Sequence, residues 1–183
     1  MRELKLVSPN RIYQSQYMNL LNECKEDIQK CGMSYFIPIS VNNSFSYYIQ
    51  RLNNYEKGLE LPEGWVPSST YWLMDNECNR ILGTITIRHM LVGYLLFRGG
   101  HISYYIRTSE RRKGYATLML KLALKKSKIL KIPKIMITCA KDNKGSAKTI
   151  QNNGGIFHSE DIEDGEIFQR YWIDNNDTSY RSN

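Results

Sequence analysis

The first third of the chain carries apolar residues at helical spacing. Between residues 11 and 30 they recur every three or four positions and leave the opposite face polar, as in an amphipathic helix. A second segment of this kind follows Asn43 and Ser44, either of which could cap a helix. The elements expected here are a strand over 3–7, a helix over 11–30 ending at Cys31-Gly32, a helix over 44–57 and a proline-containing loop over 61–67.

The pattern then changes to short runs rich in Ile, Thr and Tyr, which are typical of strands. A long amphipathic run over 115–130 interrupts them and predicts the clearest helix of the chain. Because no linker separates these elements, we expect one α/β (α+β) domain over 1–174 and a loose polar tail over 175–183. The other expected elements are strands over 69–74, 80–89, 101–107, 135–139, 156–159 and 166–173, and a helix over 146–153.

The charge of the chain is concentrated in one segment. The 183 residues carry a net charge of +7 and a 42% hydrophobic content that suits a folded domain. Residues 107–148 hold 13 Lys and Arg against 2 Asp and Glu, whereas the rest of the chain has an acidic excess. We therefore expect an acidic partner at this segment. The phosphates of a nucleotide-like ligand, a nucleic acid and an anionic membrane all meet that description.

Several classes of site find no support in the sequence. The N-terminal residues lack the apolar stretch of a signal peptide, and no apolar run approaches the ~20 residues of a membrane span. The cysteines and histidines lack the spacing of a zinc site, and no phosphate-loop motif GxxxxGKS/T occurs. We therefore expect a cytoplasmic protein with reduced thiols, no metal and no membrane partner.

The strongest chemical signal lies between the expected strand over 101–107 and the long helix. A helix start presents unpaired N–H groups and the positive end of the helix dipole. Small residues there let an oxygen-bearing ligand approach the main chain, and basic side chains add charge. These features predict a pyrophosphate cradle, and the alternative is an ordinary exposed basic turn. The residues concerned are Arg111, Arg112, Lys113, Gly114, Tyr115 and Ala116.

The order of the elements favours the cradle. Strand, basic turn, helix, strand, Asn143, helix and the pair Gly154-Gly155 follow one another as in the acetyl-coenzyme A (acetyl-CoA) site of GNAT-type N-acetyltransferases. The chain resembles that superfamily over 80–173, and looks closest to a bacterial branch of it. The segments that carry the likeness are Ile87-Arg88-His89, Gly99-Gly100-His101-Ile102, 106–116, 137–155 and Arg170-Tyr171-Trp172-Ile173.

The resemblance implies a fold and a donor. The fold is a GNAT-like mixed, mostly antiparallel twisted sheet with flanking helices and a splayed pair of parallel strands, over 101–107 and 135–139. A bulge near Tyr105 or Ile106 would drive the two strands apart. The freed main chain of Tyr105, Ile106 and Arg107 would bond the pantetheine arm of acetyl-CoA, and one N–H there would polarise the thioester carbonyl.

Two more groups of cofactor contacts follow from the resemblance. Residues 111–116 would hold the pyrophosphate. Asn143 and Ser146, at the start of the next helix, would contact the cofactor. Asn143 also suits a helix cap, and the two roles are compatible.

Transfer to an amine requires a base, because an ammonium group has no lone pair. His101, which begins the strand beside the cofactor, and His89, which ends a neighbouring strand, are the candidates, although each also suits a structural hydrogen bond. We interpret Cys139 as a core residue and not as a nucleophile that carries the acyl group.

The departing thiolate raises a separate question. Many members of the superfamily place a proton-donating tyrosine in the helix after the Asn, but Ile150 occupies that position here. Tyr171, Tyr104 or Tyr105 could replace it, or no group does, since a thiol with a pKa of about 8.5 leaves readily as thiolate. Tyr171, His101 and His89 are thus the expected catalytic residues.

The function expected from these residues is acetyl-CoA-dependent transfer of an acetyl group to a primary amine by direct attack in a ternary complex. The acidic run Glu160, Asp161, Glu163, Asp164 and Glu166 could attract a cationic acceptor or simply form a solvated turn. One alternative is a catalytically silent acyl-CoA sensor. Another is a nucleic-acid-binding module that uses the lysines of the long helix. We expect a small-molecule amine as the acceptor and no nucleic-acid partner. The sequence is also compatible with a homodimer.

Overall fold

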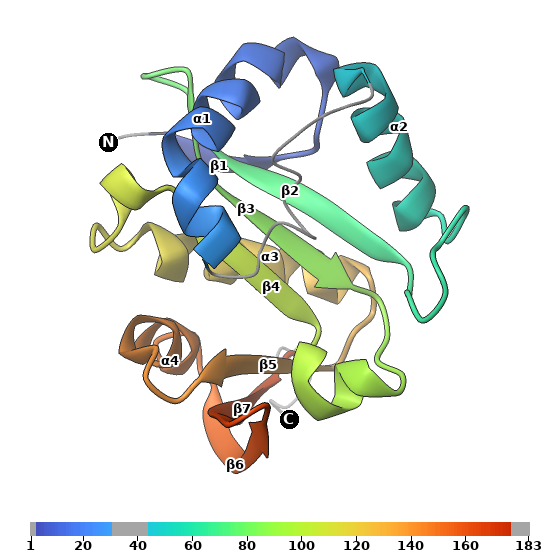
Figure 1. Cartoon of the computed structure of the whole chain (residues 1–183), viewed down its shortest axis with the longest axis vertical. Helices are drawn as coiled ribbons and strands as arrows, with labels where there is room; N and C mark the ends of the chain where they lie inside the picture. Colours follow the sequence, from blue (N-terminus) through green and yellow to red (C-terminus); the bar gives the residue numbers. More distant parts are fainter. Residues whose placement is uncertain (1–2, 31–43, 177–183) are drawn as a thin grey trace, which may run out of the picture.

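The computed structural model describes residues 3–30 and 44–176, and Figure 1 shows their arrangement. Two antiparallel sheets form the centre, with strand orders β1-β2-β3-β4 and β5-β7-β6. The strands are β1 (Leu4–Val7), β2 (Ser68–Asp75), β3 (Arg80–Arg88), β4 (Ile102–Ile106), β5 (Lys134–Ala140), β6 (Ile156–Glu163) and β7 (Glu166–Asp174). The α-helices are α1 (Gln14–Lys30), α2 (Phe45–Glu56), α3 (Tyr115–Ile129) and α4 (Lys144–Gln151).

The helices cover both faces of the first sheet because its strands alternate two apolar sets. On one face Trp72, Met74 and Ile81 pack with Tyr17 and Leu20 of α1 and with α2. On the other face the sheet packs with α3 and with the second sheet. The buried apolar cluster formed there includes Leu73, Ile85, Ile102, Met119 and Ile135. This matches the expected fold class of a mixed, mostly antiparallel sheet with flanking helices.

The two sheets meet at one end of β4 and β5. The main-chain N–H of His101 donates to the carbonyl of Met136 at 2.7 Å. Gly100, just before it, has a φ of +65°, and a Cβ at this position would lie 2.9 Å from the Met136 oxygen, so the close approach needs a glycine. From this junction β4 and β5 run in the same direction and diverge towards α4 (Figure 1). They are the expected splayed pair.

The expectation of a bulge in β4 is wrong. The pairing of β4 with β3 is continuous from Gly83↔Ile106 to Ile87↔Ile102, and the irregularity of this sheet lies instead between β2 and β3, at Leu73/Met74. The splay has another cause: β5 pairs with β7 along its whole length, so its hydrogen bonds hold it in the second sheet.

Most expected elements are present with small changes at their ends. The first helix begins with a 3-10 turn, Arg11–Tyr13, and Ser44 caps α2 through the N–H of Tyr47. Asn43 and Cys31-Gly32 lie outside the described residues. The sequence did not predict a short π-helix, η3 (Leu95–Gly99), before β4 or a 3-10 turn, η4 (Thr108–Glu110), after it.

The expected start of the loose tail is one residue too early. Asn175 is buried, its N–H donates to the carbonyl of Pro133 at 2.8 Å, and its side chain donates to the carbonyl of Ile132 at 3.1 Å. A polar residue suits this buried position because both of its donors have main-chain acceptors. Asn175 therefore belongs to the fold.

Candidate active site

The diverging edges of β4 and β5 leave an interval between the two strands, which we call the opening, and main-chain groups of alternate β4 residues face it. The N–H of Arg107 donates to the carbonyl of Leu82, and the N–H of Arg88 donates to the carbonyl of His101. With the continuous register, these bonds direct the main-chain groups of the odd-numbered β4 residues towards β3 and those of Tyr104 and Ile106 towards the opening. Of the three residues expected to offer free main chain, Tyr105 and Arg107 therefore do not.

The start of α3 is open, as expected of a phosphate cradle. Gly114 is the N-cap residue with a φ of +82°, it offers no side-chain cap, and nothing lies within 4 Å of the place a Cβ would occupy. The first N–H groups of a helix without a side-chain cap are available to an anion. Arg112 is exposed next to this start, and Tyr115 and Ala116 begin the helix.

Two of the expected cradle residues point elsewhere. The guanidinium of Arg111 bonds both carboxylate oxygens of Asp27 in α1, at 2.5 and 3.2 Å, donates to the carbonyl of Ile106 at 3.1 Å, and stacks on the ring of Tyr105. Lys113 pairs with Glu110 at 2.9 Å. Arg111 thus joins α1 to the end of β4, and we call the contact between Arg111 and Asp27 the α1 clasp.

Arg107 and Tyr105 also face α1. The side chain of Arg107 is completely buried, donates to Asn19 at 2.9 Å and pairs with Glu23 at 3.2 Å. Burial lowers the pKa of Arg107, and the charge of Glu23 opposes that shift. The hydroxyl of Tyr105 donates to Asp27 at 2.7 Å. Burial, together with that bond to a carboxylate, raises the pKa of Tyr105, so this phenol stays neutral.

The start of α4 lies across the opening from β4. The side chain of Asn143 accepts the N–H of Ser146 at 3.0 Å, so the expected cap is confirmed. The hydroxyl of Ser146 lies 2.7 Å from the hydroxyl of Tyr104. Cys139 of β5 is buried, and burial raises the pKa of its thiol to about 11 although a hydrogen bond to Ser146 opposes the shift. Groups from β4, β5 and α4 therefore meet here.

Ile150 lies in the core and does not face the opening. It is fully buried in the cluster shared with α3 and β5, and a Cβ on Gly155 would lie 2.3 Å from its Cγ2. Its side chain is apolar and packed, and its correspondence to the superfamily's tyrosine stays a prediction. A tyrosine here would overpack the core.

His101 serves the junction of the two sheets. Its Nδ1 accepts the main-chain N–H of Met136 at 3.0 Å. Burial, helped by the charge of Arg88, lowers the pKa of His101 to about 4. A neutral imidazole with Nδ1 as acceptor carries its proton on Nε2, so neither nitrogen offers a free lone pair. The structural interpretation of His101 therefore holds.

His89 ends a chain of hydrogen bonds that the sequence did not indicate. The hydroxyl of Ser69 donates to Glu56 at 2.7 Å, and its oxygen lies 2.9 Å from Nε2 of His89. Because the hydroxyl proton is directed at the carboxylate, Nε2 is the donor and Nδ1 is left as the basic atom. Burial lowers the pKa of His89, and Glu56 opposes that shift. We call these three residues the His89 relay.

Tyr171 lies in the centre of the second sheet. It is buried, its hydroxyl donates to Gln169 at 2.7 Å, and its ring packs against Phe157. Its phenol is thus held by its own strand.

The acidic run on the β6–β7 hairpin is largely used by internal pairs. Glu160 pairs with Lys141 at 2.7 Å and Asp161 with Arg170 at 3.2 Å. Arg98, in η3, pairs with both Glu163 and Glu166. The hairpin is therefore tied to η3 and to the end of β5, and it is not a free acidic surface for a cation.

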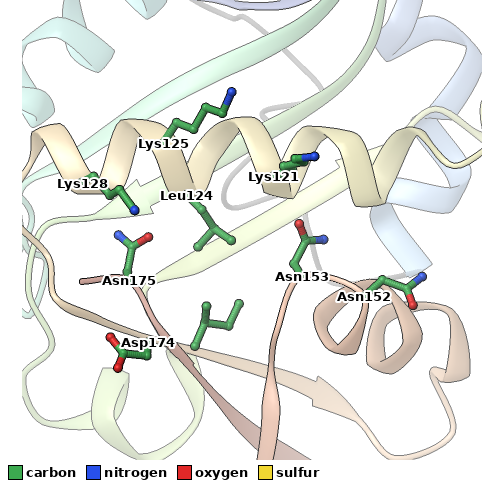
Figure 2. Close-up of a pocket in the computed structure, with 9 residues that line it drawn as sticks. Lys121, Leu124, Lys125, Lys128, Asn152, Asn153, Asp174 and Asn175 are labelled. Carbon is green, nitrogen blue, oxygen red and sulfur yellow. The ribbon is translucent and has the colours of Figure 1, made fainter. Parts of the chain in front are cut away.

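The lysines of α3 border a hollow away from the cradle. Figure 2 shows this pocket, about 340 Å³ in volume, between the later turns of α3, the end of α4 and the end of β7. It mixes basic, amide, acidic and apolar groups: Lys121, Leu124, Lys125, Lys128, Asn152, Asn153, Ile173, Asp174 and Asn175. Lys121, Lys125 and Lys128 thus share this hollow with amide, acidic and apolar groups.

None of the helices in residues 3–30 and 44–176 combines the length and the apolar composition of a membrane span. Within the same ranges, no three His, Cys, Asp or Glu side chains gather as a metal ion would require.

Comparison with known proteins gives a consistent family. The chain matches the family model described as the acetyltransferase (GNAT) domain over residues 23–156. No curated protein sequence matches it.

Solved structures share its fold at low identity. The Microcin C7 self immunity acetyltransferase MccE, in complex with acetyl-CoA and AMP, is 17% identical with a TM-score of 0.66, covering 94% of this chain and 92% of that one. The ribosomal-protein-S5-alanine acetyltransferase from Vibrio fischeri is 15% identical with a TM-score of 0.65, covering 95% and 93%. A chimera of the Vibrio cholerae spermidine N-acetyltransferase SpeG and hSSAT is 17% identical with a TM-score of 0.59, covering 94% and 95%. The family model spans most of the chain and the fold agrees with it, so this protein belongs to the GNAT acetyltransferases and is an N-acetyltransferase that uses acetyl-CoA.

Proposed function

We propose that this enzyme moves the acetyl group of acetyl-CoA to a primary amine by direct attack, with both substrates bound at once. The observation that carries the proposal is the opening between β4 and β5, which begins at the His101–Met136 junction and widens towards α4. The open start of α3 follows the far end of β4. Acetyl-CoA with its pyrophosphate at the start of α3 would therefore extend its thioester along β4.

Acetyl-CoA would be held mainly by main-chain groups of the protein. The first N–H groups of α3 would bind the pyrophosphate, with charge added by the exposed Arg112. The pantetheine arm would bond the main chain of Tyr104 and Ile106. The carbonyl of Ile106 already accepts a hydrogen bond from Arg111, so the N–H of Ile106 is the group left for the pantetheine arm. Arg111 would act by holding this end of β4 to α1.

Direct attack is supported by the state of the nearby thiol. Cys139 is buried and its pKa is raised to about 11, so very little thiolate is present at neutral pH. A thiol in this state is a weak nucleophile for an acyl-enzyme step. The amine itself would then attack the thioester carbonyl, and positioning of the two substrates would supply much of the rate.

The base would be His89, acting directly or through water. Its Nδ1 is the basic atom left by the relay, whereas both nitrogens of His101 are committed. Glu56, through Ser69, would favour the imidazolium that forms when the amine loses its proton. Proton removal by a positioned group of this kind contributes roughly 10²–10⁴-fold.

A thiol-release screen tests the function and narrows the acceptor. The enzyme is mixed with acetyl-CoA and a panel that spans polyamines, amino sugars, aminoglycosides and peptides with free N-termini, and the free thiol of coenzyme A is measured. Release that depends on one class of amine is expected. Acetyl-CoA binding without release for any amine would favour the alternative of a silent acyl-CoA sensor.

A further inference from the structure

The hollow between α3, α4 and the end of β7 lies apart from the start of α3 (Figure 2). Its first lining residue on α3, Lys121, comes six positions after Tyr115, a rise of about 9 Å along a helix. Between these two positions, the carbonyl of Thr117 accepts a side-chain N–H of Asn153 at 3.1 Å, which joins the end of α4 to α3. The hollow is therefore a concave site of its own, outside the proposed donor site.

The lining of the hollow carries a positive charge that the fold does not use up. Lys121 and Lys125 are exposed, and in residues 3–30 and 44–176 no carboxylate pairs with either of them. The acidic member of the lining is Asp174, and its Oδ1 already accepts the main-chain and side-chain N–H groups of Asn176, at 3.0 and 2.8 Å. An anion is therefore the ligand that this charge favours.

Two fixed amide groups stand on either side of Leu124. Asn153 donates through Nδ2 to the carbonyls of Thr117 and Thr149, at 3.1 and 2.9 Å, so both of its side-chain N–H groups are used. Figure 2 shows the amide oxygens of Asn153 and Asn175 on the sides that face Leu124. Amide oxygens accept hydrogen bonds, so they suit a ligand that carries N–H or O–H groups.

The base of the hollow is apolar. Leu124 and Ile173 both line it, and Leu124 packs against the buried cluster to which Ile173 belongs. Covering such a surface with a ring removes apolar area from water and is favourable. The volume of about 340 Å³ lies within the range of small-molecule sites. A flat ring system against this base would place its edge near the two amide oxygens.

We infer that this hollow is a second small-molecule site, which takes a nucleotide-like anion: an aromatic ring with N–H groups, joined to a phosphate. The ring packs on Leu124 and Ile173, and its N–H groups donate to the amide oxygens. The phosphate pairs with Lys121 and Lys125. The ammonium of Lys125 points outward in Figure 2, and the flexible stem of a lysine lets it turn to the phosphate. The site uses none of the residues assigned to acetyl transfer.

An NMR titration locates the ligand and measures its affinity together. The full chain is labelled with ¹⁵N, saturated with acetyl-CoA so that the donor site is filled, and titrated with adenosine 5′-monophosphate. We expect the side-chain amide signals of Asn152, Asn153 and Asn175 to shift along one binding curve. Adenosine and inorganic phosphate, tested separately, should each bind at least about tenfold more weakly, because each lacks one set of the contacts.

Matched variants separate the phosphate contact from the ring contact. Lys121→Gln should weaken binding of adenosine 5′-monophosphate about fivefold, the effect of one exposed charge pair, and should leave binding of adenosine unchanged. Lys125→Gln is a second variant of the same kind. Lys5→Gln removes an equal charge from an exposed position on β1 and should leave both affinities unchanged.

The contrary results are specific to this site. The absence of shifts at the three amides, or equal affinity of the wild type, Lys121→Gln and Lys125→Gln for adenosine 5′-monophosphate, would overturn the inference. Shifts that occur without acetyl-CoA but vanish when it saturates the enzyme would assign the hollow to the nucleotide part of the donor, and would overturn it as well. Failure of the wild type to bind acetyl-CoA would contradict the proposed donor site alone, because the titration without acetyl-CoA still tests the hollow.

Discussion

His101 and the main chain of Met136 form a reciprocal pair. The main-chain N–H of His101 donates to the carbonyl of Met136 at 2.7 Å, and the main-chain N–H of Met136 donates to Nδ1 of the His101 imidazole at 3.0 Å. This pair closes one end of the opening between β4 and β5. A residue that looked like a base from its place in the sequence therefore helps to hold the two sheets together.

The His101–Met136 pair predicts a specific loss of stability in acid. The pKa of His101 is about 4 in the folded protein and about 6.5 when unfolded, so its contribution is complete above pH 6.5 and is lost as pH falls towards 4. We expect a loss on the order of 2 kcal/mol in the free energy of unfolding from this group. Urea denaturation at pH 7.5 and pH 4.5 measures it.

The control for this prediction is His101→Asn. Its side-chain oxygen can accept the N–H of Met136 but does not titrate, so the difference between the two pH values should shrink by about the same 2 kcal/mol. Carboxylates titrate in both proteins and cancel in the comparison. An equal pH dependence of the two proteins would contradict the assignment.

The α1 clasp predicts energetic coupling between residues 84 positions apart in the sequence. Arg111 bonds both oxygens of Asp27, and both side chains are partly exposed. We therefore expect a coupling of about 1 kcal/mol between Asp27→Asn and Arg111→Gln in a double-mutant cycle on the free energy of unfolding. The exposed pair Lys141–Glu160 serves as the comparison and should couple less. Strict additivity at Asp27 and Arg111 would show that the clasp contributes nothing.

The His89 relay predicts how the rate depends on pH once an amine is known. Burial lowers the pKa of His89, so kcat/KM should fall on the acid side only below pH 6.5, as the imidazole gains a proton. Glu56 raises that pKa, and Glu56→Gln should therefore move the acid limb to lower pH. Glu60→Gln, which alters an exposed carboxylate bonded to Asn54, should not move it. A profile that stays unchanged in Glu56→Gln and in His89→Gln would exclude His89 as the base.

Much of the fold could be predicted because periodicity reports burial directly. The buried residues of α1, Tyr17, Leu20, Leu21, Cys24 and Ile28, are those that the helical spacing selects. The β6–β7 hairpin and α3 follow for the same reason. The prediction of a bulge in β4 was wrong. The two strands diverge because β5 pairs with β7, and this long-range pairing leaves no local signal in the sequence of β4.

The site was harder to predict because its side chains pair across the fold. Arg111 belongs to a basic run that suggested phosphate binding, yet its partner Asp27 stands in α1. One usable signal was present: Glu23 and Asp27 are four residues apart, so a helix places them on one face, opposite in charge to the basic turn. Ser69 gave no such signal, since a serine at the start of a strand is common.

Calorimetric titration with acetyl-CoA tests the central claim, that the open start of α3 holds the donor. The wild type, Gly114→Glu and Gly154→Glu are compared. Gly154 has a φ of +83° with nothing within 4 Å of a built Cβ, so both substitutions carry the same backbone strain and the same added charge. We predict binding by the wild type and by Gly154→Glu, and at least a tenfold loss of affinity in Gly114→Glu, where a carboxylate meets the pyrophosphate. Absence of binding by the wild type, or equal affinity of the two variants, would contradict the account.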